Sequence, residues 1–241
     1  LANYLYGEGI EVRVVNPLAV KHFSRMRMTR AKTDKKDAAL IAEYAKSENP
    51  PIWQPKAEHL IELQQLQSVL EGSVTRKTQL QNQYEALSFS GLKKSSALII
   101  LKKEIGHVTS VIEKIEKQME GIAQTYHKEM FKQLQSIPGI GKRTAMLLIV
   151  ITDGFTRFET AKQLVGYVGL CPRIYDSGTS VKGKQKICKM GMASMRTLLY
   201  MCAMTAKQSN HACAEMHKRL KAKGKNGKLI LVAIANKLLK Q

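Results

Sequence analysis

The 241-residue sequence is poor in aromatic side chains, which make up 6% of it. Proteins that hold single-stranded nucleic acid by base stacking depend on such side chains, so this scarcity argues against that mode of binding. Long apolar runs are also missing, because AMLLIVI, which no other run exceeds in length, is far shorter than the ~18 residues of a membrane span. No signal peptide is recognisable. We therefore expect a cytoplasmic protein with no membrane partner.

The cysteines include no CxxC pair. Cys171, Cys188, Cys202 and Cys213 are widely spaced, which argues against structural zinc and favours reduced thiols. Their spacing predicts no role for any of them.

Acidic residues are scarce in the last part of the chain. Residues 132–241 contain 20 basic and 4 acidic side chains, a net charge of +16 out of +20 for the whole sequence. Residues 1–50 contain 9 basic and 6 acidic side chains, and residues 51–131 contain 10 and 9. A field of this size indicates a polyanion as partner, with nucleic acid favoured over an anionic membrane. We expect contact with the phosphate backbone and an association with the bacterial nucleoid.

The first 50 residues predict a helix end, a turn at Gly7 and Gly9, and a strand in which Ile10, Val12 and Val14 share one face. A short basic helix and a helix in TDKKDAALIAEYA follow. A lone strand leaves backbone donors and acceptors unpaired, and the next hundred residues offer no neighbouring strand. We therefore expect upstream strands to be missing and the chain to be an N-terminally truncated copy.

Residues 57–130 have helical periodicity after the proline-rich ENPPIWQP at 48–55, which is typical of a linker. Sustained 3–4 spacing predicts a coiled coil, with Ser73 and Lys77 as polar interruptions. The break SFSGLKK allows either a hairpin of two arms or pairing between two chains. The apolar positions are Leu63, Leu66, Leu70, Leu80, Tyr84, Leu87, Leu98, Leu101, Ile105, Val108, Ile112, Ile115, Met119 and Ile122.

The sequence IPGIG lies between two apolar helical stretches. Helix-hairpin-helix proteins use such a turn because its glycines free backbone N–H groups at a helix start to hold a phosphate. Gly139 and Gly141 would supply that backbone, and Lys142 and Arg143 follow where they would reinforce it. The alternative is a plain turn between packed helices.

Two carboxylates, Asp34 and Asp37, stand at positions i and i+3 of the helix predicted in KTDKKDA. Carboxylates on one helix face can share Mg²⁺, and metal-bound phosphate is a common basis of nuclease chemistry. The alternative is equally good, because Thr33 suits an N-cap and acids in a first turn favour the helix dipole.

The stretch IYDSGTSVKGKQKICKMG, residues 174–191, places small hydroxyl side chains among lysines. A serine nucleophile needs activation and charge stabilisation at the phosphate it attacks. Ser177 precedes Gly178, so the backbone there can approach a phosphate closely, whereas Ser180 is better interpreted as a turn hydroxyl. The alternative for both is a plain glycine turn. The cations that would hold the phosphate are Arg173, Lys182, Lys184, Lys186 and Lys189.

Together these motifs resemble the DEDD transposases of the IS-one-ten insertion sequences. The resemblance rests on the order VVNP, KTDKKDAALIA, a long helical segment, IPGIG, YVGLCPR, SGTS, KGK and SMRTLLY, and it covers essentially the whole chain. Met195, within SMRTLLY, departs from the leucine or arginine common at that place. No single motif is specific, whereas the combination in this order is.

The resemblance implies a mainly α fold in three parts. These are the C-terminal remnant of a RuvC-like (RNase H fold) α/β domain at 1–50, a long coiled-coil linker at 51–131, and a helical, helix-hairpin-helix-like transposase domain at 132–241. It also implies Mg²⁺ held by an Asp-Glu-Asp-Asp tetrad, of which Asp34 and Asp37 match the last two members. Ser177 matches the serine that attacks DNA. The implied partners are double-stranded DNA, a structured guide RNA and further copies of the chain in a dimer or tetramer.

The sequence thus predicts a DNA transposase or site-specific recombinase in which Ser177 attacks a phosphodiester. Because the first half of the tetrad would lie upstream of Leu1, we expect this chain alone to be incomplete as an enzyme. The alternative function is a DNA-binding protein that dimerises through its coiled coil and has no catalytic activity.

Overall fold

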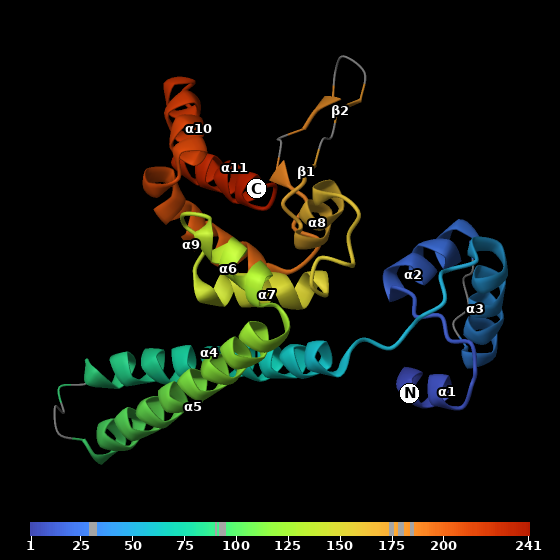
Figure 1. Cartoon of the computed structure of the whole chain (residues 1–241), viewed down its shortest axis with the longest axis horizontal. Coiled ribbons are helices and arrows are strands. Elements are labelled where there is room, and N and C mark those ends of the chain that lie inside the picture. Colours follow the sequence, from blue (N-terminus) through green and yellow to red (C-terminus); the bar gives the residue numbers. More distant parts are fainter. Residues whose placement is uncertain (29–32, 90, 92–94, 174–175, 178–180, 184–185) are drawn as a thin grey trace. The chain divides into compact units, whose positions relative to one another are not determined.

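Helices make up most of the chain in the computed structural model, which describes residues 1–28, 33–89, 91, 95–173, 176–177, 181–183 and 186–241 (Figure 1). The prediction of a mainly α protein is confirmed. The chain divides into two compact units, Leu1–Ala57 and Glu58–Gln241. Among the described residues, no helix has both the length and the apolar character that a membrane crossing requires.

The first unit contains the helices α1 (Ala2–Gly7), α2 (Pro17–Met26) and α3 (Asp34–Glu48). Helix α2 begins where the sequence provides a cap, since the Asn16 side chain accepts a hydrogen bond from the amide of Leu18 at 2.9 Å. The buried ring of Phe23 in α2 packs edge-on against Tyr44 in α3, with ring centroids 5.3 Å apart. This aromatic pair joins the two helices, together with an ion pair at 2.6 Å between Arg27, the C-cap of α2, and Glu43 of α3.

The strand predicted over Ile10, Val12 and Val14 is not formed, and this expectation was wrong. In the described part of residues 1–57 there is no strand, and Val12 instead accepts one backbone hydrogen bond, from the Trp53 amide at 2.7 Å. The Arg13 guanidinium donates to the Asn49 side chain and to the Pro50 carbonyl. Extended backbone becomes a strand only when a partner strand lies beside it. Here the partner is the proline-rich segment, which forms a single backbone hydrogen bond with Val12 and no regular ladder.

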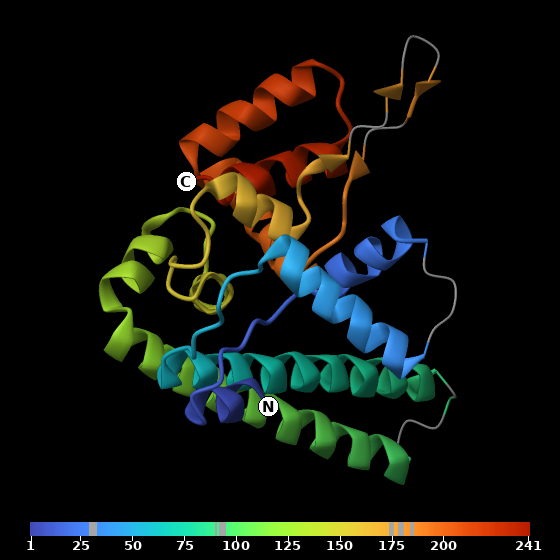
Figure 2. The same cartoon turned by 90° about the vertical axis from the view of Figure 1, so that its right-hand side faces the viewer.

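The second unit begins with two long antiparallel helices, α4 (Glu58–Ser88) and α5 (Ser96–Tyr126), which lie side by side in Figures 1 and 2. Their buried residues include Leu63 and Leu70 of α4 and Val108, Ile112 and Met119 of α5. The apolar periodicity is therefore satisfied within one chain. Of the two arrangements that the sequence allowed, the structure has the hairpin.

Helix α7 (Lys142–Thr152) is the centre of the second unit, and every residue from 144 to 152 is buried. It contacts α4, α5 and two other helices, so the base of the hairpin and the C-terminal helices share one core. The run AMLLIVI, too short to span a membrane, is therefore the middle of this core. The remaining helices are α6 (Lys128–Ser136), α8 (Ala161–Val168), α9 (Ala193–Ser209), α10 (His211–Ala222) and α11 (Gly227–Leu238).

Between α8 and α9 the chain forms two short antiparallel ladders, whose strands are drawn as arrows in Figure 1. Strand β1 (Pro172–Arg173) pairs with β4 (Lys186–Ile187), and β2 (Asp176–Ser177) pairs with β3 (Val181–Lys182). We call residues 172–187 the serine loop. The sequence predicted a glycine-rich loop here, and the ladders add a register that fixes which of its residues face each other.

Candidate nucleic-acid interface

Ser177 lies in β2 with its backbone facing Val181 of β3. The same ladder places Asp176 opposite Lys182. Ser180 and Lys184, which the sequence placed in the same stretch, lie outside the described residues. The ladder thus sets the backbone of Ser177 opposite that of Val181, within the second unit.

The other ladder of the serine loop brings two cations face to face. Arg173 of β1 and Lys186 of β4 occupy directly opposing positions, and both side chains are exposed. Like charges in opposing positions destabilise an antiparallel pair, and a bound anion removes that repulsion. Among the described residues no carboxylate forms an ion pair with either side chain. The pair is therefore suited to a phosphate group.

The base of the serine loop is held closely to the core by two glycines. Gly169 has φ +81°, and a Cβ there would lie 2.6 Å from the Met190 carbonyl oxygen. Gly191 has φ +136°, and a Cβ there would lie 2.1 Å from the Tyr167 carbonyl oxygen. Only glycine combines these backbone angles with such close approach. Exposed Lys189, another predicted DNA contact, lies between them and donates its amide to the Gly169 carbonyl at 3.2 Å.

The predicted helix-hairpin-helix turn occupies residues 137–141, between α6 and α7, and its two glycines have different surroundings. A Cβ on Gly139 would meet the Cβ of Ala206 in α9 at 2.7 Å, and Gly139 has φ +103°. A Cβ on Gly141 would meet nothing within 4 Å, and Gly141 is exposed at the N-cap of α7. Gly139 therefore serves helix packing, and Gly141 leaves the first amides of α7 open.

The two cations after the turn are paired with helix α5. The Lys142 ammonium lies 2.6 Å from the Glu120 carboxylate, and the Arg143 guanidinium lies 2.7 Å from the Glu116 carboxylate. All four side chains are partly exposed. Water screens such pairs, so a phosphate can compete for the cations, but the carboxylates oppose its approach.

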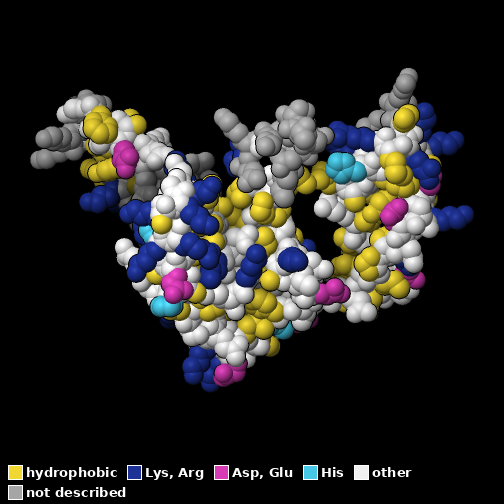
Figure 3. All heavy atoms as spheres, turned by 90° about the horizontal axis from the view of Figure 1, so that it is seen from above, with side chains coloured by type: hydrophobic (Ala, Val, Ile, Leu, Met, Phe, Trp, Pro, Cys, Tyr) yellow, Lys and Arg dark blue, Asp and Glu magenta, His cyan; other side chains and the backbone are white. Residues whose placement is uncertain are grey.

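The largest group of cations was not named residue by residue from the sequence. It lies on α10, α11 and the turn between them, and its members form no ion pair with any described carboxylate. Figure 3 shows Lys and Arg side chains gathered over this part of the molecule. The charge of residues 132–241 was the signal that could have located it. This α10–α11 basic surface consists of Lys218, Arg219, Lys221, Lys223, Lys225, Lys228 and Lys237.

A hollow of about 450 Å³ lies within the α10–α11 basic surface. It is lined by Lys218, Arg219 and Lys237, together with Ala212, Met216 and Glu215. Glu215 is the sole acidic residue after position 210, and its carboxylate faces His211 at 3.7 Å. The excess of positive charge over this hollow suits a phosphate backbone.

Asp34 and Asp37 lie in the first unit, in the first turn of α3. Thr33 caps this helix, because its hydroxyl oxygen accepts from the Lys36 amide at 3.3 Å. Asp34 is exposed and Asp37 is half-buried. Mg²⁺ accepts one or two carboxylates with water and substrate phosphates completing its shell, so these residues fit the ion. Within the described residues no third Asp, Glu, His or Cys joins them to form a metal-binding group.

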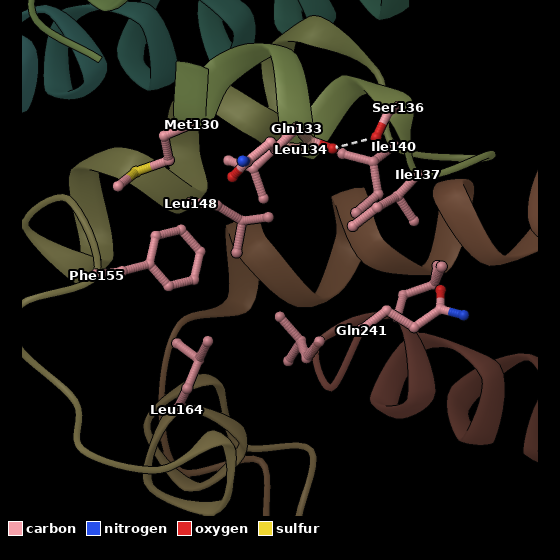
Figure 4. Close-up of a pocket in the computed structure, with 12 residues that line it drawn as sticks. Met130, Gln133, Leu134, Ser136, Ile137, Ile140, Leu148, Phe155, Leu164 and Gln241 are labelled. Carbon is pink, nitrogen blue, oxygen red and sulfur yellow. Dashed lines mark hydrogen bonds between the residues drawn. The ribbon is translucent and has the colours of Figure 1, made fainter. Parts of the chain in front are cut away.

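A cavity of about 500 Å³ between α6, α7, α8 and the end of α11 has a different character (Figure 4). Leu148, Phe155 and Leu164 point into it, and its polar lining comes from Gln133, Ser136 and Gln241. None of the described residues that line it has an ionisable side chain. Its described lining therefore offers no charged side chain to a phosphate or to acid–base chemistry.

Comparisons with known proteins found two transposase family models and several relatives that are similar to this chain. Residues 131–219 match the family model described as "Transposase IS116/IS110/IS902 family", and residues 1–87 match the DEDD transposase model of IS110, described as "Transposase". The pilin gene-inverting proteins of Moraxella lacunata and Moraxella bovis are each 34% identical, over 99% of this chain and 73% of their own length. The transposase for insertion element IS1111A of Coxiella burnetii is 26% identical, over 82% of this chain and 61% of that protein.

Proposed function

The chain belongs to the IS110 family of transposases, and from this premise we propose that it is a DNA recombinase that attacks a phosphodiester with Ser177. The observation that carries the proposal is the pairing of Arg173 with Lys186 on the loop that bears Ser177. Two exposed cations held opposite each other form a costly arrangement until an anion lies between them. A DNA phosphate there would lie on the same short loop as the serine.

In the proposed reaction the Ser177 oxygen forms a bond to phosphorus and the bond from phosphorus to one strand oxygen breaks. The serine proton leaves to a base, and the departing strand oxygen takes up a proton. Arg173, Lys182, Lys184, Lys186 and Lys189 neutralise the negative charge that grows on the phosphate oxygens. The product is a covalent protein–DNA link, which preserves the energy of the broken bond for rejoining.

Asp34 and Asp37 are the residues we propose to hold Mg²⁺. Their oxygen ligands suit this ion, which when bound neutralises phosphate charge. The family relationship supports further parts of the proposal. These are a RuvC-like origin of the first unit, double-stranded DNA and a structured guide RNA as partners, and assembly of several chains.

DNA affinity in this proposal comes chiefly from the α10–α11 basic surface, with Gly141, Lys142 and Arg143 at the start of α7 as a second contact. The cations of the α10–α11 basic surface have no carboxylate partner among the described residues, so each of them that meets a phosphate releases a counterion. With about 6 phosphates neutralised, log K should fall with a slope of roughly −5 against log salt. In this proposal the serine loop contributes mainly to the attack on the phosphodiester and little to the affinity for DNA.

A trapping experiment tests the reaction. A full-length version that carries all four acids of the family's tetrad is incubated with Mg²⁺ and suicide DNA substrates made from the ends of an insertion element, and adducts are resolved on a denaturing gel. Ser177→Ala should abolish the adduct and leave DNA affinity nearly unchanged, whereas Ser180→Ala should weaken the reaction modestly. Asp34→Asn and Asp37→Asn should each reduce adduct yield. An adduct that persists in Ser177→Ala would show that the loop only clamps phosphate.

A binding experiment tests the surface. Lys223→Gln combined with Lys225→Gln should lower affinity for duplex DNA and make the salt slope shallower by about 2. Lys114→Gln combined with Lys117→Gln, on exposed positions of α5, is the matched control with the same loss of charge. If both double variants change the slope equally, net charge and not this surface governs binding.

A further inference from the structure

Two of the four cysteines face each other at the base of the serine loop. Cys171 directly precedes β1 and Cys188 directly follows β4, one position beyond the facing pair Pro172 and Ile187. The Cys188 amide donates to the Cys171 carbonyl at 2.9 Å. Their Sγ atoms lie 3.0 Å apart, and both are free, half-buried thiols. The sequence, in which they stand 17 residues apart, gave no sign of this pair.

The backbone around the two thiols suits a disulfide. Facing residues of antiparallel strands have Cα atoms roughly 4.5–5.5 Å apart, which falls within the ~4.4–6.8 Å span of disulfide-linked residues. The sulfur atoms need to approach by about 1 Å to reach bonding distance, a change that side-chain rotation can supply. Gly169 and Gly191 already hold the two limbs of the chain together immediately below this point.

The other two cysteines provide an internal contrast. Cys202 in α9 and Cys213 in α10 are both buried in the core. The sulfur of Cys202 lies 3.2 Å from the Thr144 hydroxyl, and burial raises the pKa of Cys213. The pKa of Cys171 is also raised, first by its hydrogen bond to Cys188 and then by burial. Among the described contacts, only the pair at the loop base joins two thiols.

We propose that Cys171 and Cys188 are a site of reversible disulfide formation at the base of the serine loop. A hydroperoxide is the oxidant: one thiolate attacks its terminal oxygen, which gives a sulfenic acid and releases water or an alcohol. The second thiolate then attacks the sulfenic sulfur, the S–S bond forms, and water leaves. A dithiol restores both thiols by exchange and is itself oxidised to a disulfide.

The consequence for activity rests on the proposed function. The disulfide closes residues 172–187 into a covalent ring and restrains the backbone that carries Ser177. Attack on phosphorus needs the serine oxygen in line with the departing oxygen, and a loop that is restrained before DNA binds cannot adjust to reach that alignment, so adduct formation becomes slower. The α10–α11 basic surface lies on other helices, and its affinity for DNA does not depend on the bond.

The first experiment maps the bond itself. The protein is treated with graded hydrogen peroxide, remaining thiols are alkylated, and peptides are identified by mass spectrometry without reduction. We expect one cross-link, between Cys171 and Cys188, which dithiothreitol removes. Cys171→Ser and Cys188→Ser should each abolish it, whereas Cys202→Ser should leave it intact. Separate oxidation of Cys171 and Cys188 to sulfinic acids, or their survival as thiols, would overturn the proposal.

The second experiment compares adduct formation by the two redox states of the full-length version used for trapping. The disulfide form should give several-fold less Ser177 adduct at equal DNA affinity, and dithiothreitol should restore it. The variant with both Cys171→Ser and Cys188→Ser should not respond to peroxide. Equal adduct yields in the two states would overturn the regulatory role. A cross-link without adduct in either state would instead count against the proposed recombinase reaction.

Discussion

The Cα of Gly139 lies so near Ala206 that a Cβ added to Gly139 would come within 2.7 Å of the Ala206 Cβ. The turn between α6 and α7 therefore packs directly against α9 at Gly139. In a phosphate-binding turn, glycine leaves backbone amides accessible to the phosphate. In a packing contact, glycine allows two helices or a turn and a helix to approach closely. Here Gly139 provides the packing contact, and Gly141 is the glycine with open space.

Gly139→Ala should destabilise the fold by about 1–3 kcal/mol, since the new methyl group meets α9 and the backbone has φ +103°. Gly141→Ala, in open space with φ −88°, should change stability little and serves as the matched control. Urea unfolding measures both variants. If Gly139→Ala were as stable as the parent and only DNA affinity fell, the phosphate role assigned from the sequence would be correct for Gly139.

Glu116→Gln combined with Glu120→Gln should raise DNA affinity. The change removes two negative charges and frees Arg143 and Lys142 from their partners in α5. The salt slope should become steeper by about 1 for each freed cation that meets a phosphate. Glu113→Gln, exposed on the same helix, gives the effect of losing one negative charge without freeing either cation. Unchanged affinity and slope would show that the start of α7 does not contact DNA.

Ile112→Asp should unfold or strongly destabilise the protein, because it buries a charge between α4 and α5 of the same chain. Ile99→Asp is the control on the same helix, since Ile99 is 57% exposed and should tolerate the charge. Thermal unfolding and sedimentation are measured together. A stable Ile112→Asp protein of lower mass would mean that this residue lies between chains.

Stability should fall as the pH drops below about 6.5, and His127 should be a cause. Burial, and then the nearby His59, lower the pKa of His127, and its buried Nε2 atom has no hydrogen-bond partner among the described residues. The unfolded chain therefore takes up a proton at a higher pH than the folded chain does, so acid favours unfolding. Above the unfolded-state pKa this contribution to stability is fully present.

The matched variants for this pH effect are His127→Gln and His107→Gln. His107 is exposed on α5, so its replacement should leave the pH dependence of the unfolding midpoint unchanged. His127→Gln should flatten that dependence between neutral and mildly acidic pH. An unchanged pH profile for His127→Gln would assign the acid sensitivity to other groups.

Local patterns in the sequence indicated the helices of the first unit, the two arms of the hairpin and the helices on either side of IPGIG. The apolar spacing of residues 63–122 marked both arms of the hairpin, and IPGIG marked the turn before α7. Thr33 marked the start of α3, and the order of the motifs identified the family. Charge counting also located the basic part of the chain. These properties depend on neighbouring residues or on composition, which a sequence displays directly.

The tertiary structure decided which distant residues meet. It placed Glu116 and Glu120 beside Arg143 and Lys142, which stand 27 and 22 residues further along the chain. It also brought Cys171 to Cys188 and Gly139 to Ala206. At Val12 it paired the extended backbone with Trp53 through one hydrogen bond instead of with a strand. Such pairings arise when the chain folds and helices pack, and no local period or propensity encodes them.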